Sequence, residues 1–275
     1  MKLRNLFEIM GFRKPARRYG YKINHFFVPE VGDVKYAQWL HPSETEKDLD
    51  IRVIREYRKF IHPGDFCIDV GAHSGDSTLP MAATVGKSGM VLALEPNPYV
   101  FPILQKNMRL NRDKFNIFPI LAAACKNEGN IELEYSDPGY CNGGKHEGIS
   151  VFRHGHVYKL IAHGLNLSKD LREDFKAELP KLKFIKTDAE GFDLYILEAI
   201  EDVITEFRPY VKSEIFKKTS PEYRQRTFQF FKDKSYQIFR INSDYDLWGT
   251  LLTPDNLMEV LHYDIFCVPE NKTAH

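Results

Sequence analysis

The sequence predicts an α/β fold built on a doubly wound, mostly parallel sheet of seven strands, with an antiparallel strand at its C-terminal edge. Two observations predict it. Short apolar segments, which are typical of buried strands, alternate with longer amphipathic segments, which are typical of helices. Turns rich in glycine, proline or acidic residues follow several of the apolar segments. Alternation of this kind favours a parallel sheet with helices on both faces.

The first helix is expected at 44–60, where four apolar residues between Leu49 and Tyr57 fall on one face. Ser43 is expected to cap this helix, since Glu46 follows it three residues later. The sequence His-Pro-Gly-Asp then ends the helix and leads into a short buried strand at 66–70.

The later elements follow from the same patterns. Pro98 opens helix 98–111, because proline is favoured in a first turn. Alternating apolar and polar residues predict a half-exposed strand at 131–135. No strong helix separates the last two strands, so they are expected to pair antiparallel at the sheet edge. The remaining expected elements are helix 76–84, strands 90–94, 116–121 and 184–187, helix 191–206, strand 210–215, helix 221–234, and strands 236–241 and 263–268.

Two regions fall outside this alternation. Residues 1–43 are expected to be a basic N-terminal extension to a domain that spans 44–275. Residues 136–170 are rich in glycine and histidine and predict a long loop insertion, broken by a strand near 149–153. Long loops of this kind often form lids or binding surfaces.

The composition excludes several classes of protein. The chain has 38 basic and 38 acidic residues, so a uniformly basic protein that coats nucleic acid is not expected. No uncharged apolar run reaches the roughly 18 residues that a membrane span needs, and the first ten residues lack an apolar signal core. Four cysteines are too few for a disulfide scaffold, which indicates a reducing, cytoplasmic setting.

The N-terminus is charged unlike the rest of the chain. Residues 1–22 carry seven basic residues and one acidic residue, interleaved with apolar ones. Such a segment can lie on an anionic membrane surface or contact an acidic partner. The alternative is a solvated helix with one face packed on the body of the protein.

The first motif is Asp69–Gly75, a turn with two glycines between an apolar strand and a helix. Glycine lets the backbone approach a ligand, and the following helix offers free N–H groups. The spacing D-x-G-x-x-x-G differs from the G-x-G-x-x-G of dinucleotide-binding folds, which disfavours an NAD-linked oxidoreductase. The alternative is a tight turn without a ligand.

The second motif is Glu95, a carboxylate at the end of the next strand, followed by Pro96. In doubly wound sheets an acid at this place accepts hydrogen bonds from ribose hydroxyls. The alternative is an acid that complements the dipole of the next helix.

The third motif is an acidic cluster, Asp188, Glu190 and Asp193, which follows the strand at 184–187. Ligands of open α/β sheets bind at this edge. Asp188 and Glu190 are expected to act as a base, orient a hydroxyl or hold a hard divalent cation such as Mg²⁺. Helix capping is the alternative, and it is the favoured role of Asp193.

Together these motifs resemble the FkbM-type family of S-adenosylmethionine-dependent methyltransferases, over about residues 44–216 and in the same order. The resemblance implies the Rossmann-like sheet of class I methyltransferases. Similar sequences usually carry Asn at the position of His73. The residues that carry the resemblance are Pro63-Gly64-Asp65, Asp69–Gly75, Glu95-Pro96-Asn97-Pro98, Asn107, Asn111, Asp188-Ala189-Glu190-Gly191 and Glu214.

The resemblance also implies how S-adenosylmethionine would bind. The turn Gly71–Gly75, including Ala72, His73 and Ser74, would line the methionine end, with Asp69 beneath it. Glu95 would take the ribose hydroxyls, and Pro96 and Asn97 would border the adenine. Ala122 and Ala123 would be small enough to admit the adenine ring. The acceptor would then lie over Asp188 and Glu190.

The reaction that the resemblance implies is methyl transfer to a hydroxyl oxygen, with a sugar in a glycan, glycolipid or glycosylated metabolite as the expected acceptor. An alcohol needs a base or a metal at neutral pH, and Asp188 is the first candidate base, with Glu190 second. A histidine base is the competing idea, with His156 of the long loop as its candidate beside His146, His154 and His163. The other functions considered are methylation of nucleic acid or protein, and a cofactor-binding scaffold without catalysis.

Overall fold

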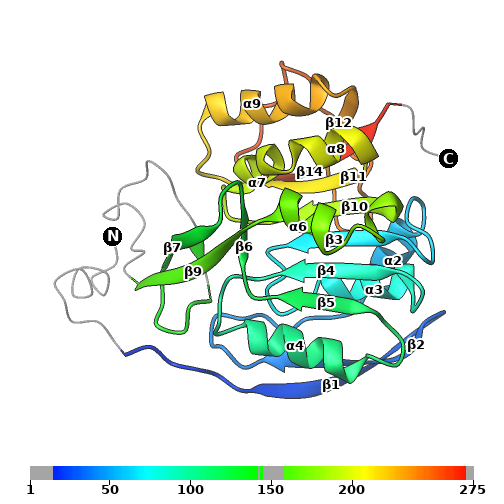
Figure 1. Ribbon diagram of the computed structural model, residues 1–275, viewed down its shortest axis with the longest axis vertical. Coiled ribbons are helices and arrows are strands. Elements are labelled where there is room, and N and C mark those ends of the chain that lie inside the picture. The colour runs from blue at the N-terminus through cyan, green and yellow to red at the C-terminus, as the bar shows by residue number, and fades with distance from the viewer. Residues whose placement is uncertain (1–14, 142, 145–157, 271–275) are drawn as a thin grey trace.

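The computed structural model describes residues 15–141, 143–144 and 158–270 (Figure 1). The strands of its main sheet are β3 (Phe66–Val70), β4 (Met90–Leu94), β5 (Ile117–Ile120), β10 (Leu182–Thr187), β11 (Tyr210–Ile215), β12 (Tyr236–Arg240), β13 (Thr250–Leu251) and β14 (Tyr263–Pro269). Their order is β13-β12-β14-β11-β10-β3-β4-β5. β3, β4, β5, β10 and β11 run parallel, and β14 runs antiparallel to both of its neighbours. The doubly wound, mostly parallel sheet expected from the sequence is confirmed.

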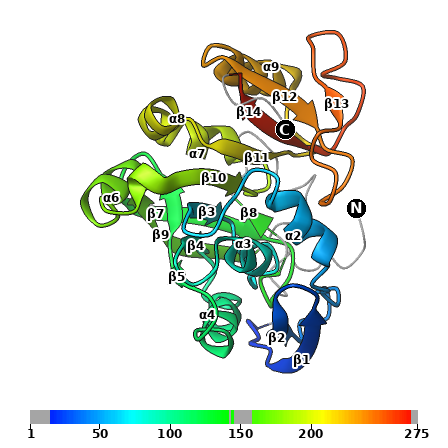
Figure 2. The ribbon, with the colours of Figure 1, turned by 90° about the vertical axis from the view of Figure 1, so that its right-hand side faces the viewer.

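Helices cover both faces of this sheet (Figure 2). One face carries α2 (Ile51–Tyr57), α3 (Thr78–Val85) and α4 (Phe101–Leu110). The other face carries α6 (Leu167–Glu173), α7 (Asp193–Ala199), α8 (Glu201–Phe207) and α9 (Pro221–Lys232), and a short 3₁₀ helix spans Leu179–Lys181. Because successive strand residues face opposite ways, Cys67 packs in the first core and Ile68 in the second.

Two smaller sheets flank the main one. β1 (Tyr21–Val28) and β2 (Gly32–Trp39) form an antiparallel hairpin. β6 (Ala123–Cys125), β7 (Gly129–Tyr135), β8 (Gly143–Gly144) and β9 (Tyr158–Asn166) form a second sheet in the order β6-β9-β7-β8. Among the described residues, no helix combines the length and apolarity that crossing a bilayer requires.

The hairpin differs from the extension expected at 1–43, because it is joined to the main domain. The side chain of Asn107, on α4, accepts a hydrogen bond from the Ala37 N–H at 2.5 Å, and that of Asn111 accepts one from the Lys35 N–H at 3.0 Å. These two asparagine side chains hydrogen-bond to the backbone of β2 much as a neighbouring strand would, and in this way they join the hairpin to α4. Residues 1–14, with most of the basic N-terminus, lie outside the described residues.

The loop expected at 136–170 is shorter than the sequence indicated. Residues 158–166 form β9, which pairs antiparallel with β7 along seven residues. Its sequence YKLIAHGLN mixes apolar residues with Gly164 and His163, which hides the alternation. A Cβ at Gly164 would lie 2.8 Å from the Cys125 sulfur, so a larger residue there would force the neighbouring side chains to move. The strand expected near 149–153 lies outside the described residues.

The helix expected at 44–60 begins only at Ile51, where the Asp50 side chain accepts a hydrogen bond from the Arg52 N–H. The preceding residues are held in an irregular course by the buried Gln38. Its amide donates to the Thr45 carbonyl at 3.0 Å and accepts from the Lys47 N–H at 2.8 Å. These bonds take the place of the first helical turns, so residues 44–50 form no regular helix and run beside the site described below.

Two further expectations need correction. The helix expected at 191–206 is two helices, α7 and α8, which are separated at Ile200. The last two long strands pair antiparallel as expected, but β14 is not an edge strand, because it lies between β11 and β12. β13 adds an eighth, two-residue strand at that edge.

Candidate functional site

A cleft of about 720 Å³ opens at the carboxyl ends of β3, β4 and β10. Gly71 and His73 line it from the turn after β3, Glu95 and Asn97 from the end of β4, and Asp188 and Glu190 from the end of β10. Residues 43–48 also line it, and Glu44 lies beside His73. The three sequence motifs therefore meet in one cleft, at the edge of the sheet where ligands of open α/β folds bind.

The turn after β3 is shaped by Gly71. The N–H groups of Gly71 and Ala72 both donate to the Leu94 carbonyl, at 3.0 and 2.9 Å. The φ angle of Gly71 is +78°, and a Cβ there would lie 2.0 Å from the Asp188 carbonyl oxygen. Only glycine fits this position. The turn and the acidic cluster consequently lie in direct contact across the sheet edge.

Asp69 lies beneath the turn and is fully buried. Its Oδ2 accepts hydrogen bonds from Ser77 Oγ at 2.8 Å and from Thr78 Oγ1 at 2.7 Å. Lys186 Nζ lies 3.4 Å from its Oδ1. Asp69 thus ties the turn to the start of α3 and to β10, and it does not line the cleft.

Ala72, Ser74 and Gly75 also lie behind the cleft, since Ala72 and Ser74 are fully buried and none of the three lines it. Ser74 Oγ is 2.7 Å from the Tyr36 hydroxyl on β2, and its carbonyl accepts from Asn107 Nδ2 at 2.8 Å. These residues hold the turn in place from the rear, whereas Gly71 and His73 face the cleft.

Glu95 organises the end of β4. Its Oε2 accepts from the His73 N–H at 2.8 Å and its Oε1 from the Asn97 N–H at 2.9 Å. Burial raises the pKa of Glu95, against the opposing effects of His73 and of the backbone hydrogen bonds. Each carboxylate oxygen has a second lone pair, so Glu95 can still accept hydrogen bonds from a hydroxyl in the cleft.

The residues expected around an adenine are divided by the structure. Asn97 lines the cleft and is fixed by its amide, which donates to the Tyr140 carbonyl. Pro96, Ala122 and Ala123 are not among the residues that line the cleft. Ala122 is fully buried in the core. Ala123 lies in β6 and pairs with Gly164 of β9.

The acidic cluster after β10 has unequal members. The Asp188 side chain is half exposed, and Lys186 Nζ lies 3.3 Å from its Oδ2. Burial disfavours the charge of Lys186, but Asp69 and Asp188 outweigh it and raise the lysine pKa. Burial, followed by the charge of Asp188, raises the pKa of Glu190, while Lys217 and Lys218 oppose the shift.

Asp193 does not cap α7 as the sequence favours, because it is the first residue of the helix and no side chain caps that end. It is 1% exposed and accepts hydrogen bonds from the Ala189 N–H at 3.1 Å and the Gly191 N–H at 3.2 Å. Burial, followed by the charge of Asp188, raises its pKa to about 7. Asp193 therefore fixes the turn that carries Glu190, whose own φ angle is +53°.

The expected hard-cation site is not supported. Among the described residues, Asp188 and Glu190 belong to no group of three metal-ligating side chains. Asp188 instead has Lys186 as its counter-ion. The candidate base His156, with His146 and His154, lies outside the described residues. His163 is exposed on β9, and His73 lines the cleft.

Sequence reasoning missed the residues that balance charge in the cleft. Of the described residues that line it, ten are acidic and three are lysines. Lys47 pairs with Asp76 at 2.8 Å, Lys186 with Asp69 and Asp188, and Lys212 with Asp244 at 2.6 Å. Lysines inside apolar strands, such as Lys186 and Lys212, are the signal that could have revealed them, because buried lysines need an acidic partner.

Glu214, on β11, is another buried acid near this cluster. Its Oε1 is 2.7 Å from His262 Nε2, and its Oε2 has no hydrogen-bond partner among the described residues. Burial, followed by the charges of Asp188, Asp193 and Glu190, raises the pKa of Glu214 to about 9.

Comparison with solved structures finds distant similarities. A methyltransferase FkbM from Methylobacillus flagellatus shares 16% identity, with a TM-score of 0.47, over 78% of this chain and 50% of that one. The chain thus spans half the length of the Methylobacillus protein. Aeropyrum pernix fibrillarin, solved with natively bound S-adenosyl-L-methionine, shares 12% identity with a TM-score of 0.42, over 93% of this chain and 98% of that one. A Thermotoga maritima S-adenosylmethionine-dependent O-methyltransferase shares 12% identity with a TM-score of 0.42, over 93% and 80%.

A search among curated proteins found no significant match. A family model described as the methyltransferase FkbM domain matches residues 69–241. That range begins at Asp69, includes Glu95 and the acidic cluster, and ends just after β12. It covers more than half of the chain, and the protein therefore belongs to the FkbM methyltransferase family.

Proposed function

We propose that this protein transfers a methyl group from S-adenosylmethionine to a hydroxyl oxygen, with a sugar hydroxyl as the acceptor. The observation that carries the proposal is the meeting of Gly71, Glu95 and Asp188 in one cleft. A glycine turn and a carboxylate that can accept from ribose hydroxyls face the cleft beside an exposed acid. The volume of about 720 Å³ lies within the usual range for ligand sites.

The residues present fit this cofactor. The bare backbone of Gly71 provides close approach for its methionine end, and Glu95 provides acceptors for its ribose hydroxyls. Asn97 and Tyr135 also line the cleft and would border the adenine. When bound, S-adenosylmethionine supplies an electrophilic methyl group, so the protein has mainly to align the acceptor and remove its proton.

Asp188 is the proposed base, with Glu190 as second candidate. Asp188 combines an accessible carboxylate with a fixed backbone, since its N–H donates to the Val70 carbonyl at 3.0 Å. Lys186 sets the orientation of the carboxylate from the buried side. In Glu190, the raised pKa makes the carboxylate a stronger base, but its side chain is more buried.

The charge of the cleft favours an uncharged acceptor. All three lysines that line it are paired with acids, and acids outnumber them by ten to three among the described lining residues. Such a surface repels polyanions, which opposes nucleic acid as the acceptor. A neutral sugar is compatible with it, since carboxylates accept hydrogen bonds from hydroxyl groups.

Calorimetric titration with S-adenosylmethionine and S-adenosylhomocysteine, with NAD as the control, tests the cofactor. We expect S-adenosylmethionine and S-adenosylhomocysteine to bind and NAD not to bind. The acceptor is then tested by incubating the protein with S-adenosylmethionine that carries a labelled methyl group, neutral oligosaccharides and glycolipids, and RNA as the comparison. Label in the sugar fractions supports the proposal. Label in RNA alone would overturn the sugar assignment, and no binding of either sulfur compound would overturn the enzyme assignment.

A further inference from the structure

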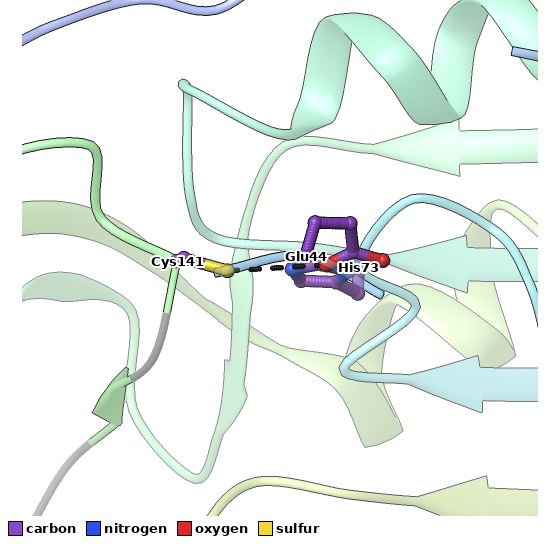
Figure 3. Close-up of side chains that lie close together, drawn as sticks. All are labelled: Glu44, His73 and Cys141. Atoms are coloured by element: carbon purple, nitrogen blue, oxygen red, sulfur yellow. Dashed lines mark hydrogen bonds and ion pairs between the residues drawn. The ribbon is translucent and has the colours of Figure 1, made fainter. Parts of the chain in front are cut away.

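We propose that Glu44, His73 and Cys141 form a site for a transition-metal ion of the zinc class on the wall of the cleft. The three side chains come from the segment between β2 and α2, the turn after β3 and the segment after β7. Figure 3 shows the Cys141 sulfur pointing toward the Glu44 carboxylate and the His73 ring. The inference does not depend on the proposed methyl transfer, because the ion can be tested alone.

The donor atoms already lie close to the geometry of a metal site. His73 Nδ1 and Cys141 Sγ each lie 3.9 Å from Glu44 Oε2, and all three atoms lie within 4.8 Å of one another. With zinc–ligand bonds of about 2.0–2.3 Å, the donors of a tetrahedral site lie roughly 3.3–3.8 Å apart. Small movements of side chains are therefore enough to bring the three donors around one ion.

The chemistry of the donors selects the kind of ion. A thiolate, an imidazole and a carboxylate suit zinc and similar transition metals, whereas Mg²⁺ prefers oxygen ligands alone. Three protein ligands leave a fourth position for a water molecule or another oxygen donor. Because the three residues all line the cleft, that position is available to a molecule bound in it.

Glu44 is a buried carboxylate with few partners. Its side chain is 5% exposed, and its Oε1 receives no hydrogen bond from the described residues. Lys47 Nζ lies 3.4 Å from Oε1, and the contacts of Oε2 with His73 and Cys141 are both 3.9 Å. A buried carboxylate normally has closer partners, and a cation between Glu44, His73 and Cys141 would provide one.

Other residues hold the three ligands in place. Asp137 accepts from the Cys141 N–H at 3.0 Å and is 2.9 Å from His41 Nε2. The His41 carbonyl in turn accepts from the Glu44 N–H at 3.0 Å. The His41–Asp137 contact thus links the segments that carry Glu44 and Cys141, and Glu95 fixes the backbone of His73. Supporting contacts of this kind orient the ligands of metal sites.

Titration of the metal-stripped full chain with Co²⁺, followed by absorption spectroscopy, tests the site. Cobalt replaces zinc in such sites, and a sulfur ligand gives a charge-transfer band in the near ultraviolet. We expect this band to saturate at one Co²⁺ per chain and to disappear when Zn²⁺ is added. Cys141→Ser should abolish the band, and Asp137→Asn should weaken Co²⁺ binding by about 10–100-fold.

Cys125→Ser is the matched control, because Cys125 is also buried and hydrogen-bonded but lies on β6, outside the site. Its band should equal that of the wild type. Glu44→Gln keeps the thiol and the side-chain shape, so it should retain the band at saturating Co²⁺ but bind more weakly. This variant keeps the test decisive if Cys141→Ser does not fold. Absence of the band in the wild type, its persistence in Cys141→Ser, or unchanged affinity in Glu44→Gln would each overturn the proposal.

Discussion

The α-carbon of Gly71 packs so closely against the carbonyl of Asp188 that a Cβ would lie 2.0 Å from that oxygen. The contact joins two strands, because the Asp188 N–H also donates to the Val70 carbonyl at 3.0 Å. The glycine-rich turn and the acidic cluster are 117 positions apart in the sequence. The position of the proposed base is consequently set by the same turn that would contact the cofactor.

Gly71→Ala should therefore disturb both stability and ligand binding. A non-glycine residue forced into a sparsely populated backbone region costs about 1–3 kcal/mol, and the clash with Asp188 adds to this cost. The free energy of unfolding in urea and the calorimetric affinity for S-adenosylmethionine are the measurements. Gly86→Ala is the control, because Gly86 also has a positive φ of +67° but no atom within 4 Å of a Cβ. Equal stability and equal affinity in the two variants would contradict this account of the turn.

Glu95→Gln should weaken the binding of S-adenosylmethionine by about 1–3 kcal/mol, or roughly 5–150-fold. The amide replaces one acceptor oxygen with a donor, which faces the N–H groups of His73 and Asn97. Calorimetric titration measures the affinity. Glu56→Gln is matched to it, since Glu56 is also buried and accepts from the Leu247 N–H at 3.1 Å, outside the cleft. An affinity that falls equally in both variants would assign Glu95 a purely structural role.

The sequence predicted the parts of this site that depend on local patterns. The apolar strand before Gly71 and the acid at position 95 each follow from a few neighbouring residues. The turn at His73 has a φ of +48°, a conformation in which asparagine and histidine are both enriched among non-glycine residues. Histidine is therefore compatible with the backbone of this turn.

The parts that were missed depend on contacts between distant residues. The periodicity of 44–60 predicts a helix, but the hydrogen bonds of Gln38 to Thr45 and Lys47 keep the residues before Ile51 out of it. β9 is stabilised by pairing with β7, which its own sequence does not reveal. Lys186 interrupts an apolar strand, and only the positions of Asp69 and Asp188 explain its burial. Tertiary contacts override local preference at each of these places.

Asp188→Asn should reduce kcat by about 10²–10⁴-fold, the usual effect of removing a general base. Binding of S-adenosylmethionine should change little, because the substitution keeps the shape of the side chain and leaves Gly71 and Glu95 intact. Steady-state kinetics with the acceptor from the labelling screen, together with calorimetry, measure the two effects. Asp244→Asn is the control, since Asp244 lines the same cleft and pairs with Lys212. A kcat that is unchanged in Asp188→Asn would move the role of base to Glu190.

Glu214 should make the folded protein less stable as the pH rises from 7 to 9. Burial, followed by the charges of Asp188, Asp193, Glu190 and Asp264, raises its pKa from 4.5 to about 9, and His262 Nε2 lies 2.7 Å from its Oε1. Between pH 7 and pH 9, Glu214 keeps its proton in the folded chain, whereas the unfolded chain has released it. The free energy of unfolding therefore falls with pH, by at most about 1.4 kcal/mol per pH unit for one group.

The interval from pH 7 to 9 isolates this group from Asp193, whose pKa of about 7 places most of its own effect at lower pH. Urea unfolding at pH 7, 8 and 9 measures the slope for the wild type and for Glu214→Gln. The variant carries no titrating proton at this position, so its slope should be smaller and its stability at pH 9 higher than that of the wild type. Glu222→Gln is the control, because hydrogen bonding to Ser220 lowers the pKa of that exposed carboxyl, and its titration lies far below the interval. Identical slopes in all three proteins would show that Glu214 is already ionised in the folded state at pH 7.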